Sequence, residues 1–264
     1  MAETKEKTKK LDLKLDPADM MQAGLHFGHK TSKIHPKIKP YLFGARNGVH
    51  IFDLEKTAEK LKEALEFIQK IISEEKVLLF VGTKVQIKEL VKKAAIECGL
   101  PYISERWLGG TFTNFDIIKK RVDYLKELEE EKASGEQEKY TKKERIKINS
   151  EIEVLKLKFE GLKDLKSLPQ AVFVADMKKD TLAIREAKVK GIKVIAIVDT
   201  NLDPTLADFP IPANDDAVNS VSYILEKIKE TVLRSRTELP LAETKAKKKA
   251  EPSLTAKAKK DGKD

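Results

Sequence analysis

Three short runs of apolar residues constrain the fold of this chain more than any other feature. They cover Val77–Val81, Ala171–Ala175 and Val194–Val198, and patterns typical of amphipathic helices separate them. Strands that are apolar on both faces are typical of a parallel sheet covered by helices on both sides. Right-handed crossovers between such strands give a doubly wound arrangement. The sequence therefore predicts an α/β domain with a mostly parallel, flavodoxin- or Rossmann-like sheet.

The helix patterns have recognisable ends. One apolar stripe runs from Leu54 to Ile72 at spacings of three and four, which is helical periodicity. Asp16-Pro17 is typical of a helix start, and Asp180 is expected to cap a helix that Gly191 ends. A last helix is expected after a cap at Asn214 or Asp215, and two further short strands are expected at His50–Phe52 and Tyr102-Ile103.

A stretch without any strand pattern interrupts this alternation. Between residues 114 and 168, apolar residues repeat at heptad-like spacings in two series on either side of a polar turn. Thr141 and Glu144 have the spacing of a capping box at the start of the second series. We therefore predict an antiparallel helical (coiled-coil) hairpin over 114–168, inserted into an α/β domain formed by 11–113 and 169–238.

The two ends of the chain carry most of its charge. The net charge is +9, of which residues 1–10 contribute +2 and residues 239–264 contribute +4. Both ends have little apolar surface to bury, which predicts a disordered N-terminal segment at 1–10 and a disordered Lys-rich tail at 239–264. Because the body is nearly balanced in charge, binding to a polyanion must depend on local patches or on the tails.

Several classes of protein are excluded. No apolar run exceeds five residues, whereas a membrane span needs roughly 20. Cys98 is the only cysteine, which excludes an intramolecular disulfide and a multi-cysteine zinc site. The first residues lack the apolar segment of a secretory signal. We therefore expect a cytoplasmic protein with no membrane partner.

An enzymatic alternative rests on residues at the predicted strand ends. Asp176 and Asp199 are of the type that holds Mg²⁺ for phosphoryl transfer, which would make the chain a phosphohydrolase. However, Gly82-Thr83-Lys84 contains a single glycine and matches neither common phosphate-binding loop. Aspartates at strand ends also commonly form turns and caps. We expect no catalytic residues and no cofactor.

A metal site is a second alternative, because His26 and His29 are three residues apart. On one helix they would share a face, but Gly24 and Gly28 disfavour a continuous helix there. We therefore expect no metal.

Two segments have the composition of an RNA contact. The first is basic, loop-rich and interleaved with aromatic residues between His26 and His50, and the second is the string Arg106–Phe115 with its glycine pair. Lysines and aromatic groups on loops suit an RNA backbone and its unstacked bases. The alternatives are a solvated loop for the first and a hinge packed under Trp107 for the second. The predicted RNA-binding residues are Lys30, Lys33, Lys37, Arg46, Lys84 and Arg106.

An ordered set of short motifs resembles the family of small-subunit ribosomal protein two. The matching strings, in chain order, are His26-Phe27-Gly28-His29, Asn47–Ile51, Leu54–Thr57, Phe80–Lys84, Arg106–Gly110, Thr113-Asn114, Ile197–Asn201, Asp203-Pro204 and Asn214–Ala217. They run from about Met20 to Val232, and the predicted hairpin is similar to that of the bacterial type. The chain differs from the family at Ile34-His35-Pro36 and Ala213.

The resemblance implies a structural, non-enzymatic constituent of the small ribosomal subunit that acts in translation. It would bind small-subunit rRNA near the junction of head and body and help recruit the large mRNA-binding ribosomal protein. The family resemblance also implies a protein that is not a homo-oligomer. A further alternative is a non-ribosomal adaptor that works through its coiled-coil hairpin.

Overall fold

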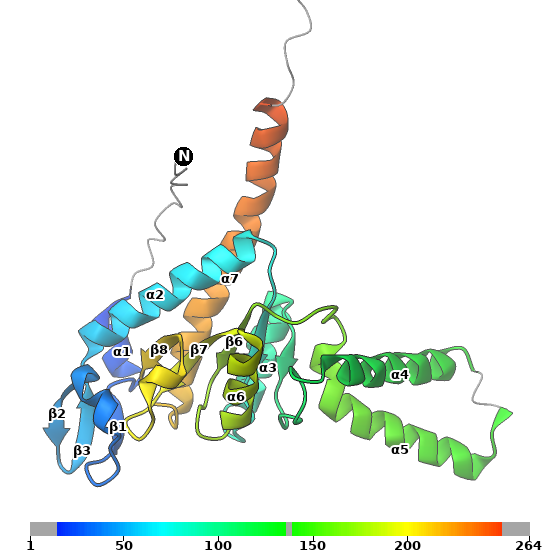
Figure 1. The fold of residues 1–264 in the computed structure, drawn as a ribbon, viewed down its shortest axis with the longest axis horizontal. Coiled ribbons are helices and arrows are strands. Elements are labelled where there is room, and N and C mark those ends of the chain that lie inside the picture. The colour runs from blue at the N-terminus through cyan, green and yellow to red at the C-terminus, as the bar shows by residue number, and fades with distance from the viewer. Residues whose placement is uncertain (1–14, 136–138, 250–264) are drawn as a thin grey trace, which may run out of the picture.

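The three apolar runs form neighbouring strands of a five-stranded parallel sheet. A computed structural model describes residues 15–135 and 139–249 of the chain (Figure 1). The strand order is β5-β4-β6-β7-β8, and the direction of winding reverses between β4 and β6, as in flavodoxin-like folds. The prediction of a doubly wound parallel sheet is confirmed. The strands are β4 (Leu78–Val81), β5 (Tyr102–Ile103), β6 (Ala171–Val174), β7 (Lys193–Val198) and β8 (Phe209–Pro212).

Alternate side chains of these strands enter two separate cores. On β4, Leu78 and Phe80 face the core shared with α2 (Leu54–Ser73), α3 (Lys88–Cys98) and α7 (Val218–Lys249). Their neighbours Leu79 and Val81 face the core shared with α6 (Thr181–Lys190) and the base of the hairpin. Burying each large apolar side chain stabilises the fold by roughly 1.5–3 kcal/mol. This burial on both faces holds the helices of each layer against the sheet.

A second, smaller sheet precedes the parallel one. Its order is β1-β3-β2, with both pairs antiparallel. Asn47-Gly48 joins β2 to β3 with φ values of 52° and 74°, and such a turn is the strongest short-range signal for a β-hairpin. Only β3 was expected from the sequence. The elements are α1 (Pro17–Gln22), β1 (Phe27–Lys30), the 3-10 helix η1 (Pro36–Tyr41), β2 (Leu42–Arg46) and β3 (Val49–Phe52).

Two long helices project from the edge of the parallel sheet where β5 lies (Figure 1). They are α4 (Phe115–Ala133) and α5 (Lys142–Phe159), followed by the 3-10 helix η3 (Glu160–Leu162). The predicted capping box is present, because Thr141 accepts from the Glu144 amide and the Glu144 side chain accepts from the Thr141 amide. Most residues of the predicted apolar series are buried in the hairpin, among them Ile118, Val122, Leu125, Ile152, Leu155 and Phe159, whereas Ile148 is only partly buried and Leu128 is buried in addition.

The C-terminal helix is longer than expected. α7 continues to Lys249, so residues 239–249 of the predicted disordered tail are helical in the structure. Apart from Pro240, their sequence consists largely of Lys, Ala and Leu, which are strong helix formers. The remaining predicted disordered residues, 1–10 and 250–264, lie outside the described part of the chain. Within the described ranges, no helix is both long and apolar enough to cross a membrane.

The edge strand β8 was not expected, because Pro210 and Pro212 lie within it. Proline removes a backbone donor and is tolerated mainly at sheet edges. β8 pairs only with β7 in the strand order, so its prolines do not interrupt a second partner. The short 3-10 helix η4 (Pro204–Leu206) leads into it.

Candidate nucleic-acid interface

The carboxyl ends of the parallel strands bring charged residues from four strands together. We define the strand-end cluster as Lys84 after β4, Asp176 after β6, Asp199 after β7, and Asp215 and Asp216 after β8. In open α/β sheets this edge, where the strand order reverses, is where ligands usually bind.

Lys84 is neutralised within the strand-end cluster. Its Nζ lies 2.7 Å from an Asp216 carboxylate oxygen, 3.2 Å from one of Asp215 and 3.3 Å from one of Asp176. Its side chain is only 14% exposed. Burial acts to lower the pKa of Lys84, but the Asp216 hydrogen bond and the charges of Asp215 and Asp176 outweigh it and raise the pKa. The sequence placed Lys84 among the RNA contacts, whereas the structure gives its charge internal partners.

Two carboxyl groups at this edge hold protons unusually well. Burial, followed by repulsion from Asp176 and Asp199, raises the pKa of Asp215 to about 7. Burial also raises the pKa of Asp180 to about 6. Asp180 stands at the predicted start of α6 but does not cap it with its side chain. Instead, it accepts hydrogen bonds from the Thr83 amide and hydroxyl, at 3.2 and 2.8 Å, and so ties α6 to the end of β4.

The two aspartates of the phosphohydrolase alternative are engaged internally. One oxygen of Asp176 accepts from the amides of Lys178 and Lys179, and the other faces Lys84. Asp199 accepts from the amide and hydroxyl of Thr200, and its second oxygen lies 3.0 Å from His29 Nδ1. These carboxylates therefore act as turn formers and ion-pair partners.

His29 joins this edge from the smaller sheet. Its Nε2 lies 3.6 Å from Asp216, and one ligand atom each from His29, Asp199 and Asp216 lie within 4.8 Å of one another. An imidazole and two carboxylates are ligand types that suit zinc, so these three residues can hold a metal ion. His26, the partner considered from the sequence, is not in this group, and burial lowers its pKa.

The smaller sheet carries an exposed group of cations that we call the basic tip, formed by Lys30, Lys33 and Arg46. Lys30 and Arg46 lie on either side of Val49 in the strand register, and strands are spaced about 4.8 Å apart. All three residues are exposed. Within the described residues, none of their side chains has a hydrogen-bond or ion-pair partner, so the basic tip presents its charges to solvent.

Lys37 has an intermediate environment. Its Nζ donates to Asp203 at 2.8 Å and to the Thr205 hydroxyl at 3.0 Å, yet its side chain remains 54% exposed. The Lys37 hydrogen bond lowers the pKa of Asp203. Lys37 therefore holds η1 against η4 while part of its side chain stays accessible.

Arg106 lies apart from the basic tip. It is exposed in the loop between β5 and α4, and Figure 1 shows the hairpin and the smaller sheet at opposite sides of the parallel sheet. Beside it, Trp107 is buried and contacts Phe112 edge-on, with ring centroids 4.8 Å apart. The structure thus supports the expected packing under Trp107 and also leaves Arg106 outside. The six predicted residues do not form one patch.

An apolar groove runs between the smaller sheet, α1 and the start of α2. Its volume is about 1010 Å³, and Met21, Phe27 and Phe43 line it. Phe43 is 83% exposed and Phe27 is 49% exposed. Exposed apolar side chains gathered in one groove are typical of surfaces that bind a partner. In the sequence, only the aromatic residues of this segment indicated such a surface.

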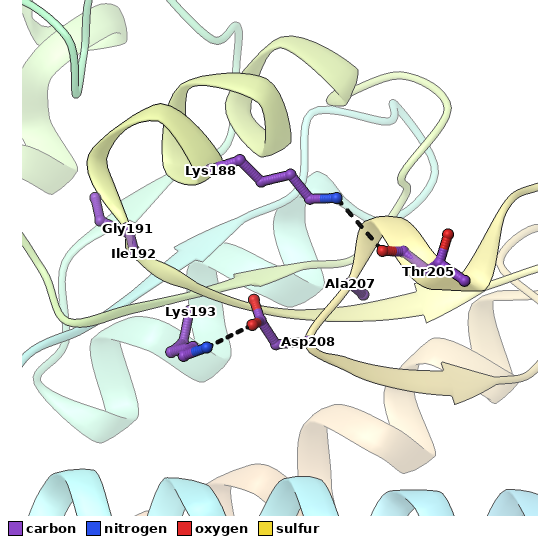
Figure 2. A pocket seen from close by; sticks show the side chains of 7 residues that line it. All are labelled: Lys188, Gly191, Ile192, Lys193, Thr205, Ala207 and Asp208. Atoms are coloured by element: carbon purple, nitrogen blue, oxygen red, sulfur yellow. Dashed lines mark hydrogen bonds and ion pairs between the residues drawn. The ribbon is translucent and has the colours of Figure 1, made fainter.

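A second pocket, of about 280 Å³, lies at the opposite, amino ends of β7 and β8 (Figure 2). Figure 2 shows Lys193 directed at Asp208 and Lys188 directed at Thr205. The Lys193–Asp208 ion pair is 2.7 Å long, and Lys188 donates to the Thr205 carbonyl. The polar groups of this pocket thus satisfy one another.

Comparisons with known proteins agree with the fold. The model of the family "Ribosomal protein S2" matches residues 20–235. The chain is 46% identical over 217 residues to small ribosomal subunit protein uS2 of Dictyoglomus thermophilum, covering 82% of this chain and 88% of the relative. It is 46% identical over 217 residues to uS2 of a Roseiflexus species, covering 82% and 83%. With uS2 of Dehalococcoides mccartyi the identity is 42% over 225 residues, covering 85% and 92%.

The family match resolves the alternatives for the strand-end aspartates. A phosphohydrolase would need free carboxylates at this edge, but they are paired, and the matched family is structural and not enzymatic. The parallel sheet and the family match over most of the chain lead to one conclusion: this chain belongs to the ribosomal protein S2 family, in its bacterial type.

Proposed function

We propose that this protein is a structural constituent of the small ribosomal subunit that binds small-subunit rRNA and helps recruit the large mRNA-binding ribosomal protein. It acts in translation, within cytoplasmic ribosomes, and not as a homo-oligomer. The observation that carries the proposal is the basic tip, where Lys30, Lys33 and Arg46 are exposed at one end of the smaller sheet and, within the described residues, lack internal partners. The names of the relatives support the ribosomal role.

The six predicted cations divide into three roles. Lys30, Lys33, Arg46 and Arg106 contact phosphates, because their charges are exposed. Lys37 adds a weaker contact while it holds Asp203, and Lys84 organises the strand-end cluster. Each phosphate neutralised steepens the salt dependence of binding by roughly 0.7–0.9 in the slope of log K against log salt.

The apolar groove serves the recruitment of the second protein. Met21, Phe27 and Phe43 offer an apolar surface at the edge of the smaller sheet, close to the basic tip. Buried aromatic side chains dominate the energy of protein–protein contacts. A short segment of the large mRNA-binding ribosomal protein, carrying aromatic or aliphatic anchors, fits such a groove.

Sedimentation tests the ribosomal role. The tagged chain should co-migrate with small subunits and with complete ribosomes in a sucrose gradient at about 10 mM Mg²⁺, and high salt should weaken the association. A chain with Lys30, Lys33 and Arg46 all changed to Ala should be depleted from subunits while its unfolding midpoint stays unchanged. Migration of the wild-type chain as a free protein in every run would contradict the proposal.

The recruitment role has its own test. Phe43→Ser should leave incorporation of this chain intact and reduce the amount of the large mRNA-binding protein on the same subunits. Val189→Ser, at a similarly exposed apolar residue on α6, is the matched control. Equal amounts of that protein on both variant subunits would remove the groove from the proposal.

A further inference from the structure

One buried carboxylate holds the whole loop that carries Arg106. Glu186 lies on α6 and is 6% exposed. It accepts hydrogen bonds from the Gly110 amide at 2.8 Å, the Phe112 amide at 2.9 Å and the Thr113 amide at 3.2 Å. It also accepts from the Trp107 indole and from the Thr113 hydroxyl, both at 3.2 Å.

These five donors determine the shape of the loop. Residues 104–114 form no regular strand or helix, and Gly110 adopts a positive φ of 93°, which glycine tolerates best. A buried loop of this kind must satisfy its amides elsewhere. Burial acts to raise the pKa of Glu186, but the amide hydrogen bonds outweigh it and lower the pKa, so the group is an anion that the loop surrounds.

While the loop amides face inward to Glu186, the side chain of Arg106 faces solvent. Arg106 is exposed just before Trp107, and within the described residues its guanidinium makes no hydrogen bond or ion pair. The same loop leads directly into α4, and the Asn114 amide donates to the Gly110 carbonyl at 2.8 Å. The conformation around Gly110 therefore sets both the position of Arg106 and the entry to the hairpin.

We propose that Glu186 is a positioning residue for RNA binding, which holds the loop 106–113 so that Arg106 meets the rRNA backbone. The proposal rests on the proposed function and deepens it, since it assigns the presentation of one contact to a buried acid on another helix. Glu186 itself does not touch RNA, because its carboxylate is enclosed by the loop.

The test is a double-mutant cycle in the full chain. Affinity for a transcript of the complete small-subunit rRNA is measured at one salt concentration for wild type, Glu186→Gln, Arg106→Ala and the double variant. Glu186→Gln should weaken binding about tenfold, because the NH2 group that replaces one carboxylate oxygen faces the loop donors bonded to that oxygen and releases them. In the double variant, Glu186→Gln should add little to the loss caused by Arg106→Ala, because both act through one contact.

Three further measurements separate positioning from plain destabilisation. In Glu186→Gln, amide exchange should accelerate at Gly110 or at Phe112 and Thr113, according to which oxygen the amide nitrogen replaces. Asp208→Asn, which removes one negative charge at the far end of β8 (Figure 2), should leave affinity and this exchange unchanged. If Glu186→Gln does not fold, Trp107→Phe removes one donor and keeps a ring, and it should weaken binding two- to threefold.

The outcomes distinguish failure of the positioning role from failure of the proposed function. Wild-type affinity in a folded Glu186→Gln chain, or losses that multiply in the double variant, would overturn the positioning role. No binding by the wild-type chain would instead reject the proposed function, before Glu186 is considered.

Discussion

Lys84 and Arg106 follow the carboxyl ends of two adjacent parallel strands, yet their surroundings differ completely. Lys84 is 14% exposed and faces three carboxylates. Arg106 is exposed and, in the described part of the chain, has no partner. One cation therefore belongs to the interior of the protein and the other to its surface. The comparison teaches that position at a strand end is not enough to predict a ligand contact for a cation. A cation that is paired with acids from other strands, as Lys84 is, has no charge left to offer a ligand.

The difference arises from what each neighbouring strand contributes. Beside β4 lies β6, which Asp176 follows, and the loop after β8 adds Asp215 and Asp216. Beside β5 there is only β4, because β5 is the edge strand. Two acids lie at the Arg106 loop: Glu105 pairs with Lys88 at 2.8 Å, and the oxygens of Glu186 are occupied by loop donors. Both acids are therefore engaged by other groups, and Arg106 has no ion-pair partner in the described part of the chain.

Removal of the Lys84 ammonium should give the largest effect on stability. Lys84→Ala leaves Asp176, Asp215 and Asp216 close together without a cation, and breaking a buried pair in this way costs about 3 kcal/mol of unfolding free energy. Urea unfolding measures it. Lys88→Ala, which removes a half-exposed ion pair to Glu105 at 2.8 Å, should cost no more than about 1 kcal/mol. Equal losses in the two variants would contradict the contrast between buried and exposed cations.

The sequence could predict the elements around Lys84 but not its partners. Apolar runs and helix caps locate β4, β6 and β7 because burial on both faces leaves a local pattern. The acids that face Lys84 lie 92 to 132 residues away along the chain, and no local pattern reports such a pairing. The same holds for Glu186, which the sequence shows only as one acid in an ordinary helix.

Two strands that the sequence analysis did not predict, β2 and β8, do have a local sequence signal, but an opposing local signal competes with it. The Asn47-Gly48 turn is a strong hairpin signature, but the many prolines and glycines around it favour a loop. β8 contains two prolines, which normally exclude a strand, and only its edge position makes it possible. The site residues followed the same division: the basic tip is visible as a local charge pattern, whereas the role of Lys84 depends on tertiary structure.

The pH dependence of stability offers a second test of how buried charged groups differ from exposed ones, and Asp180 is the residue that carries it. Burial raises its pKa to about 6, so the folded chain keeps this proton over a range in which the unfolded chain, with an ordinary pKa of about 3.9, has released it. Its contribution to stability is therefore present below about pH 4 and is lost as the pH rises to about 6. Asp180→Asn should remove roughly 2 kcal/mol of this pH dependence.

Urea unfolding between pH 4 and pH 7 checks this prediction. Asp208→Asn is the control with the opposite sign. Burial acts to raise the pKa of Asp208, but the hydrogen bonds from Lys193 and the Val194 amide together outweigh it and lower the pKa. Asp208 stabilises the fold at neutral pH and loses this contribution as the pH falls through its lowered folded-state pKa. A pH profile of Asp180→Asn parallel to that of wild type would show that Asp180 is ionised in the folded chain.

Arg106→Glu should have the smallest effect on the free energy of unfolding, and its effect on the salt dependence of RNA binding is the most specific readout. Because the Arg106 side chain makes no hydrogen bond or ion pair within the described residues, charge reversal should leave the urea midpoint unchanged. It should weaken rRNA binding at least tenfold, which corresponds to about 1.4 kcal/mol, and lower the salt slope by about one phosphate contact. Lys84→Ala should do the reverse, since it destabilises the fold while the folded fraction binds RNA with wild-type salt dependence. If Arg106→Glu destabilises the chain and leaves the salt slope unchanged, Arg106 belongs with Lys84 as a structural cation, and the interface reduces to the basic tip.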